Sequence, residues 1–157
     1  MAKVIAINIS EKKGIPKHAV AEGYFKEDWG LEGDAHAGNW HRQVSLLGRE
    51  SIRKIELLGM EGLCTGRFAE NITTEGIILY ELPVGSRFNI GECLFEVTQI
   101  GKECHQHCAI FHQVGDCVMP REGIFAWVIK GGWIRPGDDL TVLDQPASAT
   151  GTIASKS

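Results

Sequence analysis

Residues 83–100 have the sequence PVGSRFNIGECLFEVTQI, and this stretch indicates the fold class most clearly. Two apolar segments, Ser86–Ile90 and Cys93–Ile100, are separated by the turn-forming pair Gly91-Glu92. Short segments that are rich in β-branched and aromatic residues and bounded by glycine or proline predict β-strands. The stretch therefore predicts two short strands with a turn between them.

The same pattern extends along the chain on both sides of this stretch. Further apolar segments alternate with turn signals, and they lie at Ile77–Leu79, Phe125–Ile129 and Asp139–Leu143. Near the N-terminus, Lys3–Ser10 predicts a largely buried strand, and Gln43–Leu47 predicts another. Between them, Glu11–Asn39 is rich in glycine and charge, which indicates a long loop.

One helix is expected among these strands. Within Arg49–Leu58, three apolar residues (Ile52, Ile55 and Leu58) share one helical face, and Gly59 and Gly62 end the segment. The chain has 157 residues and 19 glycines, a share well above the usual ~7%. We therefore expect a mainly β fold, a compact barrel-like sheet of short strands with one or two packed helices. It would form a single domain over residues 1–144, with a disordered tail over 145–157.

Composition excludes several classes of function. The formal net charge is −4, which disfavours binding to nucleic acid or to an anionic membrane through bulk charge. No signal peptide, no apolar run long enough to span a bilayer and none of the GxGxxG, GxxxxGK[ST], GxSxG or HExxH motifs occurs. The five cysteines are an odd number, which indicates reduced thiols and a cytoplasmic protein.

A cluster of cysteine and histidine is the densest group of chemically reactive residues. It comprises Cys104, His105, His107, Cys108, His112 and Cys117. Thiolates and imidazoles suit zinc, although the spacing lacks the usual paired CxxC arrangement. A second interpretation is a reactive thiol at Cys104, because Lys102 and His105 are nearby cationic groups that lower a thiol pKa. The third is that these cysteines are small buried apolar residues, as Cys64 and Cys93 are expected to be.

Two further groups could bind a ligand. Gly33, Asp34, His36 and Gly38 form a loop whose backbone can approach a ligand closely, with Arg42 just beyond it. Asn71 could donate a hydrogen bond to a substrate oxygen or cap a turn instead. Arg121 could hold an anion through its guanidinium group, or lie exposed in a turn.

These motifs, in this order, resemble the MOSC domain family, named for the C-terminal domain of molybdenum cofactor sulfurase. The matching segments are GLEGDAHAG (30–38), RQVSL (42–46), FAENITTEG (68–76), LPVG (82–85) and FEVTQ (95–99) leading to Cys104. The resemblance implies a strand-rich, barrel-like fold and assigns the family's cysteine to Cys104. Many members have a proline just before that cysteine, where this chain has Glu103.

The resemblance implies three alternative functions. In the first, Cys104 accepts sulfane sulfur as a persulfide from a cysteine desulfurase and delivers it to the molybdenum cofactor, to molybdoenzymes or to metal–sulfur centres. Cys108 and Cys117, with His105 and His107, are possible helpers. Pyridoxal phosphate would act only in the partner desulfurase. In the second, Cys104 is a molybdenum ligand in a pterin-binding reductase of N-hydroxylated substrates, where Arg42, Arg121 and backbone amides of Gly33–Gly38 hold the cofactor phosphate. The third is a non-catalytic cofactor-binding or zinc-binding module.

Overall fold

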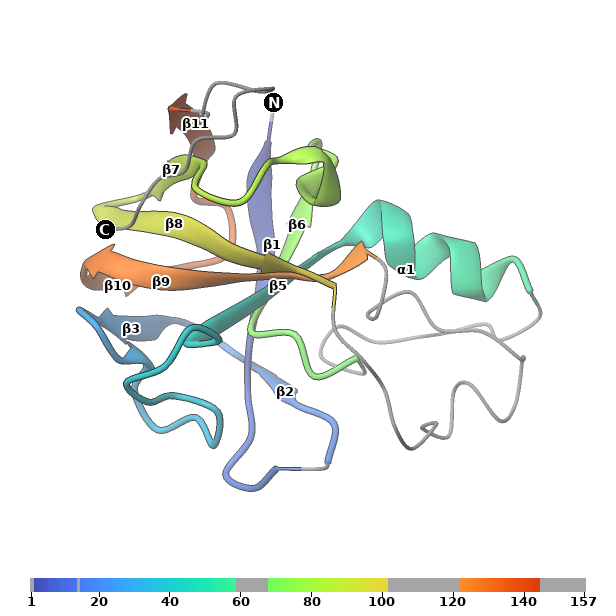
Figure 1. The fold of residues 1–157 in the computed structure, drawn as a ribbon. Coiled ribbons are helices and arrows are strands. Elements are labelled where there is room, and N and C mark those ends of the chain that lie inside the picture. Colours follow the sequence, from blue (N-terminus) through green and yellow to red (C-terminus); the bar gives the residue numbers. More distant parts are fainter. Residues whose placement is uncertain (1, 14, 59–67, 102–121, 145–157) are drawn as a thin grey trace.

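The structure is a computed structural model that describes residues 2–13, 15–58, 68–101 and 122–144, and strands dominate it (Figure 1). The strands in these residues are β1 (Lys3–Ile9), β2 (His18–Val20), β3 (Gly23–Lys26), β4 (Gly30–Leu31), β5 (Val44–Gly48), β6 (Ile72–Glu75), β7 (Arg87–Ile90), β8 (Cys93–Ile100), β9 (Ile124–Lys130), β10 (Gly132–Ile134) and β11 (Leu140–Asp144). The helices are α1 (Arg49–Glu56) and the short 3-10 helix η1 (Leu79–Glu81).

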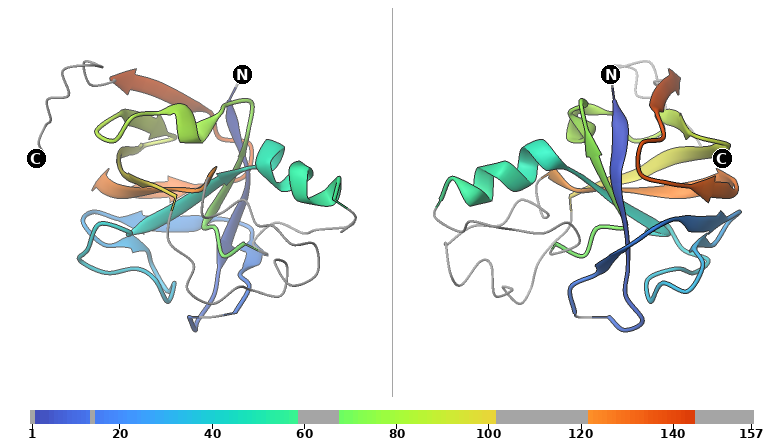
Figure 2. Two further views of the ribbon diagram at one scale, coloured as in Figure 1. Left: turned by 45° about the vertical axis from the view of Figure 1, so that its right-hand side comes forward. Right: turned by 180° about the vertical axis from the view of Figure 1, so that it is seen from behind.

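Eight of the strands form one curved sheet in the order β11-β7-β8-β9-β5-β6-β1-β2. Its strand pairs are antiparallel, except that β5 and β6 run parallel. The remaining three strands make a small second sheet in the order β10-β3-β4. Figure 2 shows the curvature of the large sheet from two further sides.

The expected mainly β fold is confirmed, but the sheet is not a closed barrel. The chain before β11 does reach β1, where the Val4 N–H donates to the carbonyl of Asp138 at 2.9 Å. The N–H groups of Gly137 and Leu140 also donate to the carbonyls of Val4 and Ala2, at 2.7 and 3.0 Å, but in the described residues these contacts form an isolated bridge between Lys3 and Asp139 and not a ladder of paired strand residues. The curved sheet therefore brings β1 and the start of β11 together without closing through a continuous ladder of paired residues.

The core lies inside this curl. Phe88 of β7 and Phe95 of β8 are directly paired across the strands, and their rings stack with centroids 5.2 Å apart. Phe25 of β3 meets Phe95 edge to face at 5.8 Å, so the small sheet covers the same core. All three rings are fully buried. Cys93 is also fully buried in this cluster, and burial raises the pKa of its thiol to about 12, as do the nearby carboxylates of Glu92 and Asp138.

Helix α1 follows β5 directly and packs through Ser51, Ile52 and Ile55. It ends at Glu56, two residues earlier than the sequence predicts. Leu58, expected on the buried face, is half exposed, so that part of the prediction is wrong. Gly59 and Gly62 lie outside the described residues. No helix in the part of the chain that the structure describes is long and apolar enough to cross a membrane.

Two other segments differ from the sequence-based expectation. The predicted loop over Glu11–Asn39 contains β2, β3 and β4, which form because β1 and β10 offer edges for them to pair with. The predicted strand at Ile77–Leu79 is wrong, because the chain turns after Gly76 and enters η1. The single-domain boundary remains a prediction, and residues 145–157 lie outside the described part.

Candidate functional site

A buried ion pair holds the glycine-rich loop that follows β4. The Nζ atom of Lys17 lies 2.7 Å from Oδ1 of Asp34, and neither side chain is exposed to solvent. The same carboxylate accepts hydrogen bonds from the backbone N–H groups of Ser10 and His36, each at 3.0 Å. A buried charge is tolerated when it is paired and hydrogen-bonded, and these contacts satisfy both conditions.

The carboxyl group of Asp34 is charged in this environment. Burial by itself raises the pKa of the group, since it disfavours the anion. The hydrogen bond and positive charge of Lys17, together with the two backbone N–H donors, outweigh that effect. The pKa of Asp34 therefore lies below its ordinary value, and the ion pair persists at neutral pH.

The loop backbone is occupied by contacts within the protein. Gly33 has a φ of +88°, and Gly30 has a φ of +121° and lies so close to the backbone of Gln43 that an added Cβ would stand 2.5 Å from its carbonyl oxygen. The N–H groups that follow all donate to acceptors in the chain, and they belong to Asp34, Ala35, His36, Ala37 and Gly38. A ligand phosphate would have to displace these bonds to reach the N–H groups of residues 34–38.

His36 has the one polar side chain with access to solvent among loop residues 33–38. Its Nδ1 atom lies 3.0 Å from Nζ of Lys17, and its side chain is 31% exposed. Its backbone carbonyl accepts a hydrogen bond from the indole N–H of Trp40 at 2.9 Å. His36 thus joins the buried ion pair to a more exposed aromatic side chain.

Arg42 connects this loop region to the end of β8. Its Nε donates to Oε1 of Gln99 at 3.2 Å, and the amide nitrogen of Gln99 donates to the carbonyl of Gly101 at 2.7 Å. The guanidinium group also lies over two aromatic rings, at 5.2 Å from the centroid of Phe125 and 5.9 Å from that of Trp40. Its two terminal nitrogens make no hydrogen bond to the residues that the structure describes.

Asn71 lies inside the sheet rather than at the loop surface. It is 1% exposed. Its Oδ1 accepts hydrogen bonds from the backbone N–H and the hydroxyl of Ser45, at 3.0 and 3.2 Å, and its Nδ2 donates to the carbonyl of Asn8 at 3.3 Å. The side chain therefore links β1, β5 and the start of β6. The fully buried Glu70 beside it accepts from the hydroxyl of Thr73 at 2.7 Å.

The remaining predicted site residues lie outside the described part of the chain, and they are Cys104, His105, His107, Cys108, Cys117 and Arg121. Their roles, like those of Gly33, Asp34, His36, Gly38, Arg42 and Asn71 in ligand binding, stay predictions. Within the described ranges, no group of three or more His, Cys, Asp or Glu residues is arranged to hold a metal ion.

The order of these loop and strand residues matches a known family. The model of the MOSC domain matches residues 33–141, from the loop that carries Asp34 and His36 into β11. The chain belongs to the MOSC domain family. This family is generally linked to the binding of molybdenum cofactor and to the handling of sulfur. Lys17 lies before the matched region, although its side chain completes the loop's buried charge cluster.

Solved structures share the fold of this MOSC domain. It is similar to the YuaD protein of Bacillus subtilis, with a TM-score of 0.76 and 19% identity over 90% of this chain and 96% of that one. It is also similar to YiiM of Geobacillus stearothermophilus, with a TM-score of 0.73 and 21% identity over 95% and 78% of the two chains. It is similar as well to YiiM of Escherichia coli, with a TM-score of 0.68 and 19% identity over 94% of this chain and 72% of that one. No protein with a curated function matches the sequence significantly.

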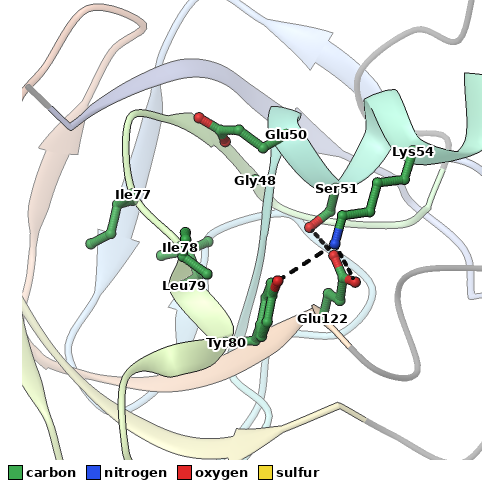
Figure 3. A pocket seen from close by; sticks show the side chains of 9 residues that line it. All are labelled: Gly48, Glu50, Ser51, Lys54, Ile77, Ile78, Leu79, Tyr80 and Glu122. Carbon is green, nitrogen blue, oxygen red and sulfur yellow. Dashed lines mark hydrogen bonds and ion pairs between the residues drawn. The ribbon is translucent and has the colours of Figure 1, made fainter. Parts of the chain in front are cut away.

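A second feature of this MOSC domain is a pocket of about 180 Å³ between α1, η1 and the start of β9 (Figure 3). Ser51 and Lys54 point from α1 toward Glu122, and Tyr80 lies at the lower side of the pocket in this view. The Ser51 hydroxyl donates to Oε1 of Glu122 at 2.5 Å, and Nζ of Lys54 donates to Oε2 at 2.8 Å. The bond to Glu122 raises the pKa of Lys54. The described chain resumes at Glu122 after Gly101. The hydrogen bonds from Ser51 and Lys54 therefore hold Glu122 against α1.

Sequence reasoning missed Lys17, which pairs with Asp34 in the loop, and it missed Ser51 and Glu122, which bond to each other beside the pocket. Lys17 lies in a charged stretch whose composition indicates a solvated loop, and only its burial against Asp34 reveals its role. Ser51 and Glu122 come from distant parts of the chain, and neither belongs to a recognisable motif. Ser51 shares a helical face with Ile52 and Ile55, which was the one signal of its burial.

Proposed function

We propose that this MOSC domain carries sulfur. Cys104 accepts sulfane sulfur as a persulfide from a cysteine desulfurase and passes it to the molybdenum cofactor or to a metal–sulfur centre. The family's link to sulfur handling supports the general class. The specific role of Cys104 as the carrier is our proposal.

One observation carries the proposal, namely a continuous series of contacts from the charged loop to the end of β8. The carbonyl of His36 binds Trp40, whose ring lies over Arg42. Arg42 binds Gln99, and Gln99 binds Gly101. Cys104 follows Gly101 by three residues, a separation that an extended chain spans in roughly 10 Å. The loop and Arg42 are therefore connected to the end of β8, three residues before Cys104 in the sequence.

The loading step needs a thiolate and balances without an outside oxidant or reductant, whereas delivery of the outer sulfur to a metal centre as sulfide takes two electrons from a thiol reductant. The Cys104 thiolate attacks the outer sulfur of the donor persulfide, so that a new sulfur–sulfur bond forms on Cys104 while the donor's bond breaks. The donor departs as a thiolate, and no net oxidation occurs. Positive charge favours a thiolate over a thiol, and Arg42 supplies permanent positive charge at the end of β8.

Loading by a desulfurase tests the proposal. The protein is incubated with a cysteine desulfurase and cysteine, and its intact mass is measured. We expect a mass increase of one sulfur atom that dithiothreitol removes, which distinguishes a persulfide from irreversible sulfinic acid. Cys104→Ser should lose the adduct, whereas Cys64→Ser and Cys93→Ala should keep it. Equal loading of Cys104→Ser and the wild type would contradict the proposal.

The alternative is a molybdenum-pterin reductase with Cys104 as the metal ligand. Its cofactor would supply two-electron redox chemistry when bound. The described residues fit the anionic part of such a cofactor, because the terminal guanidinium nitrogens of Arg42 make no hydrogen bond to other described residues. Arg42 would hold the phosphate. Molybdenum retained by the wild type and lost from Cys104→Ser would favour this alternative over sulfur transfer.

A further inference from the structure

The buried ammonium group of Lys17 has three hydrogen-bonding neighbours. These are Oδ1 of Asp34 at 2.7 Å, Nδ1 of His36 at 3.0 Å and Oγ of Ser10 at 3.1 Å. The lysine side chain has no exposed surface. An ammonium group has three hydrogens to donate and no lone pair with which to accept. Its three hydrogens and its three neighbours therefore match one to one.

This arrangement fixes the position of the proton on His36. Since Lys17 can only donate, Nδ1 of His36 must accept with its lone pair. The reverse assignment, a neutral lysine beside a charged imidazolium, is disfavoured because an alkylammonium is a far weaker acid than an imidazolium. The carboxylate of Asp34 at 2.7 Å also favours charge on the lysine. The neutral imidazole then has its proton on Nε2.

We infer that Lys17 is a positioning residue that holds His36 as the Nε2–H tautomer, so that His36 serves the site as a hydrogen-bond donor and not as a metal ligand. A histidine that binds a metal through Nε2 needs the lone pair on that atom, and it usually donates its Nδ1–H to a carboxylate or a carbonyl. Here the geometry is reversed. Oδ2 of Asp34 lies 3.9 Å from Nδ1, and the lysine is closer.

The chemical class of the ligand follows from the donor. His36 is 31% exposed, and its Nε2–H suits a group with an accepting oxygen or sulfur atom, such as an oxyanion or a perthiolate. The identity of that group as part of a sulfur-transfer or cofactor site rests on the proposed function above. The tautomer itself does not depend on it.

Nitrogen-15 NMR of the full-length protein measures the tautomer directly. Two-bond correlations between ring protons and nitrogens should show a pyrrole-type Nε2 and a pyridine-type Nδ1 for His36 at neutral pH. In Lys17→Met, Oδ2 of Asp34, 3.9 Å from Nδ1, can accept a proton from that atom, so we expect the His36 signals to change toward the Nδ1–H tautomer. Lys12→Met, which removes an exposed lysine of the same segment, should leave them unchanged. A pyridine-type Nε2 in the wild type would overturn the inference, whether or not Lys17→Met folds.

Conservative substitution separates donation from metal binding. The amide nitrogen of glutamine reaches the position of Nε2 more closely than that of asparagine. His36→Gln should therefore retain more sulfur loading than His36→Asn, at least several-fold. Equal loss in both variants, with loading normal in the wild type, would contradict the donor role. Absence of loading in the wild type would instead contradict the proposed function, and the NMR result would still decide the tautomer.

Discussion

The Nζ atom of Lys17 lies 2.7 Å from Oδ1 of Asp34 in a part of the molecule where neither side chain meets solvent. Removal of one partner leaves a buried charge without its counter-ion, which costs about 3–5 kcal/mol. We expect Lys17→Met to lower the free energy of unfolding by that amount, and Lys17→Met/Asp34→Asn to lower it by less than the sum of the single changes. Urea unfolding of the four proteins measures this coupling. Simple additivity, within about 0.5 kcal/mol, would show that the two groups do not interact.

The same carboxylate predicts how stability depends on pH. The folded pKa of Asp34 lies below its ordinary value of 3.8, because its hydrogen bonds and Lys17 outweigh the effect of burial. The stabilisation that the Asp34 carboxylate contributes is complete above pH 3.8, and it is lost as the pH falls below that value toward the pKa of the folded protein. The difference in unfolding free energy between the wild type and Asp34→Asn should therefore shrink as the solution is acidified below this point. A difference that grows on acidification would contradict the assignment.

Two glycines with positive φ offer a matched test of the loop's packing. Both Gly30 (φ +121°) and Gly137 (φ +100°) would strain an alanine. At Gly30 the added Cβ would also lie 2.5 Å from the carbonyl oxygen of Gln43, whereas at Gly137 nothing lies within 4 Å. We expect Gly137→Ala to cost about 1–2 kcal/mol and Gly30→Ala to cost clearly more, as measured by thermal unfolding. Equal costs would show that the close approach at Gly30 relaxes freely.

The two hydrogen bonds to Glu122, from Ser51 and Lys54, are expected to contribute unequally to the stability of the protein. Ser51 is buried, and its loss leaves a carboxylate oxygen of Glu122 without its donor, which costs about 1–3 kcal/mol. The Lys54 side chain is 51% exposed, and ion pairs of this kind contribute about 0–1 kcal/mol. Ser51→Ala should therefore destabilise the protein more than Lys54→Met in urea unfolding. The opposite ranking would mean that the charge, and not the buried hydrogen bond, dominates.

Strands whose side chains follow the apolar pattern were predictable from the sequence. β7 and β8 have buried phenylalanines at facing positions and a glycine turn between them, so local sequence and final structure agree. β2 has exposed residues at His18 and Ala19, and it exists because β1 provides an edge. β6 contains the buried threonines Thr73 and Thr74, and the sequence analysis predicts no strand at these residues. Pairing with distant residues overrides local composition in both cases.

The residues of the candidate site were also predictable from the sequence only in part. The loop with Asp34 and His36 was identifiable from its residue types, since glycine, carboxylate and imidazole together are unusual. Lys17 was not identifiable, because a lysine among Glu11, Lys12 and Lys13 has the composition of a solvated segment. Its burial depends on Asp34, 17 residues further along the chain, and no local pattern encodes that contact.

Native mass spectrometry of the full-length protein, purified from cells that make molybdenum cofactor, tests the central claim most directly. The account predicts one additional sulfur atom, mapped to Cys104 by peptide analysis and removed by dithiothreitol, with no bound molybdenum pterin. A retained molybdenum pterin, or one equivalent of zinc with no sulfur adduct, would contradict sulfur transfer through Cys104.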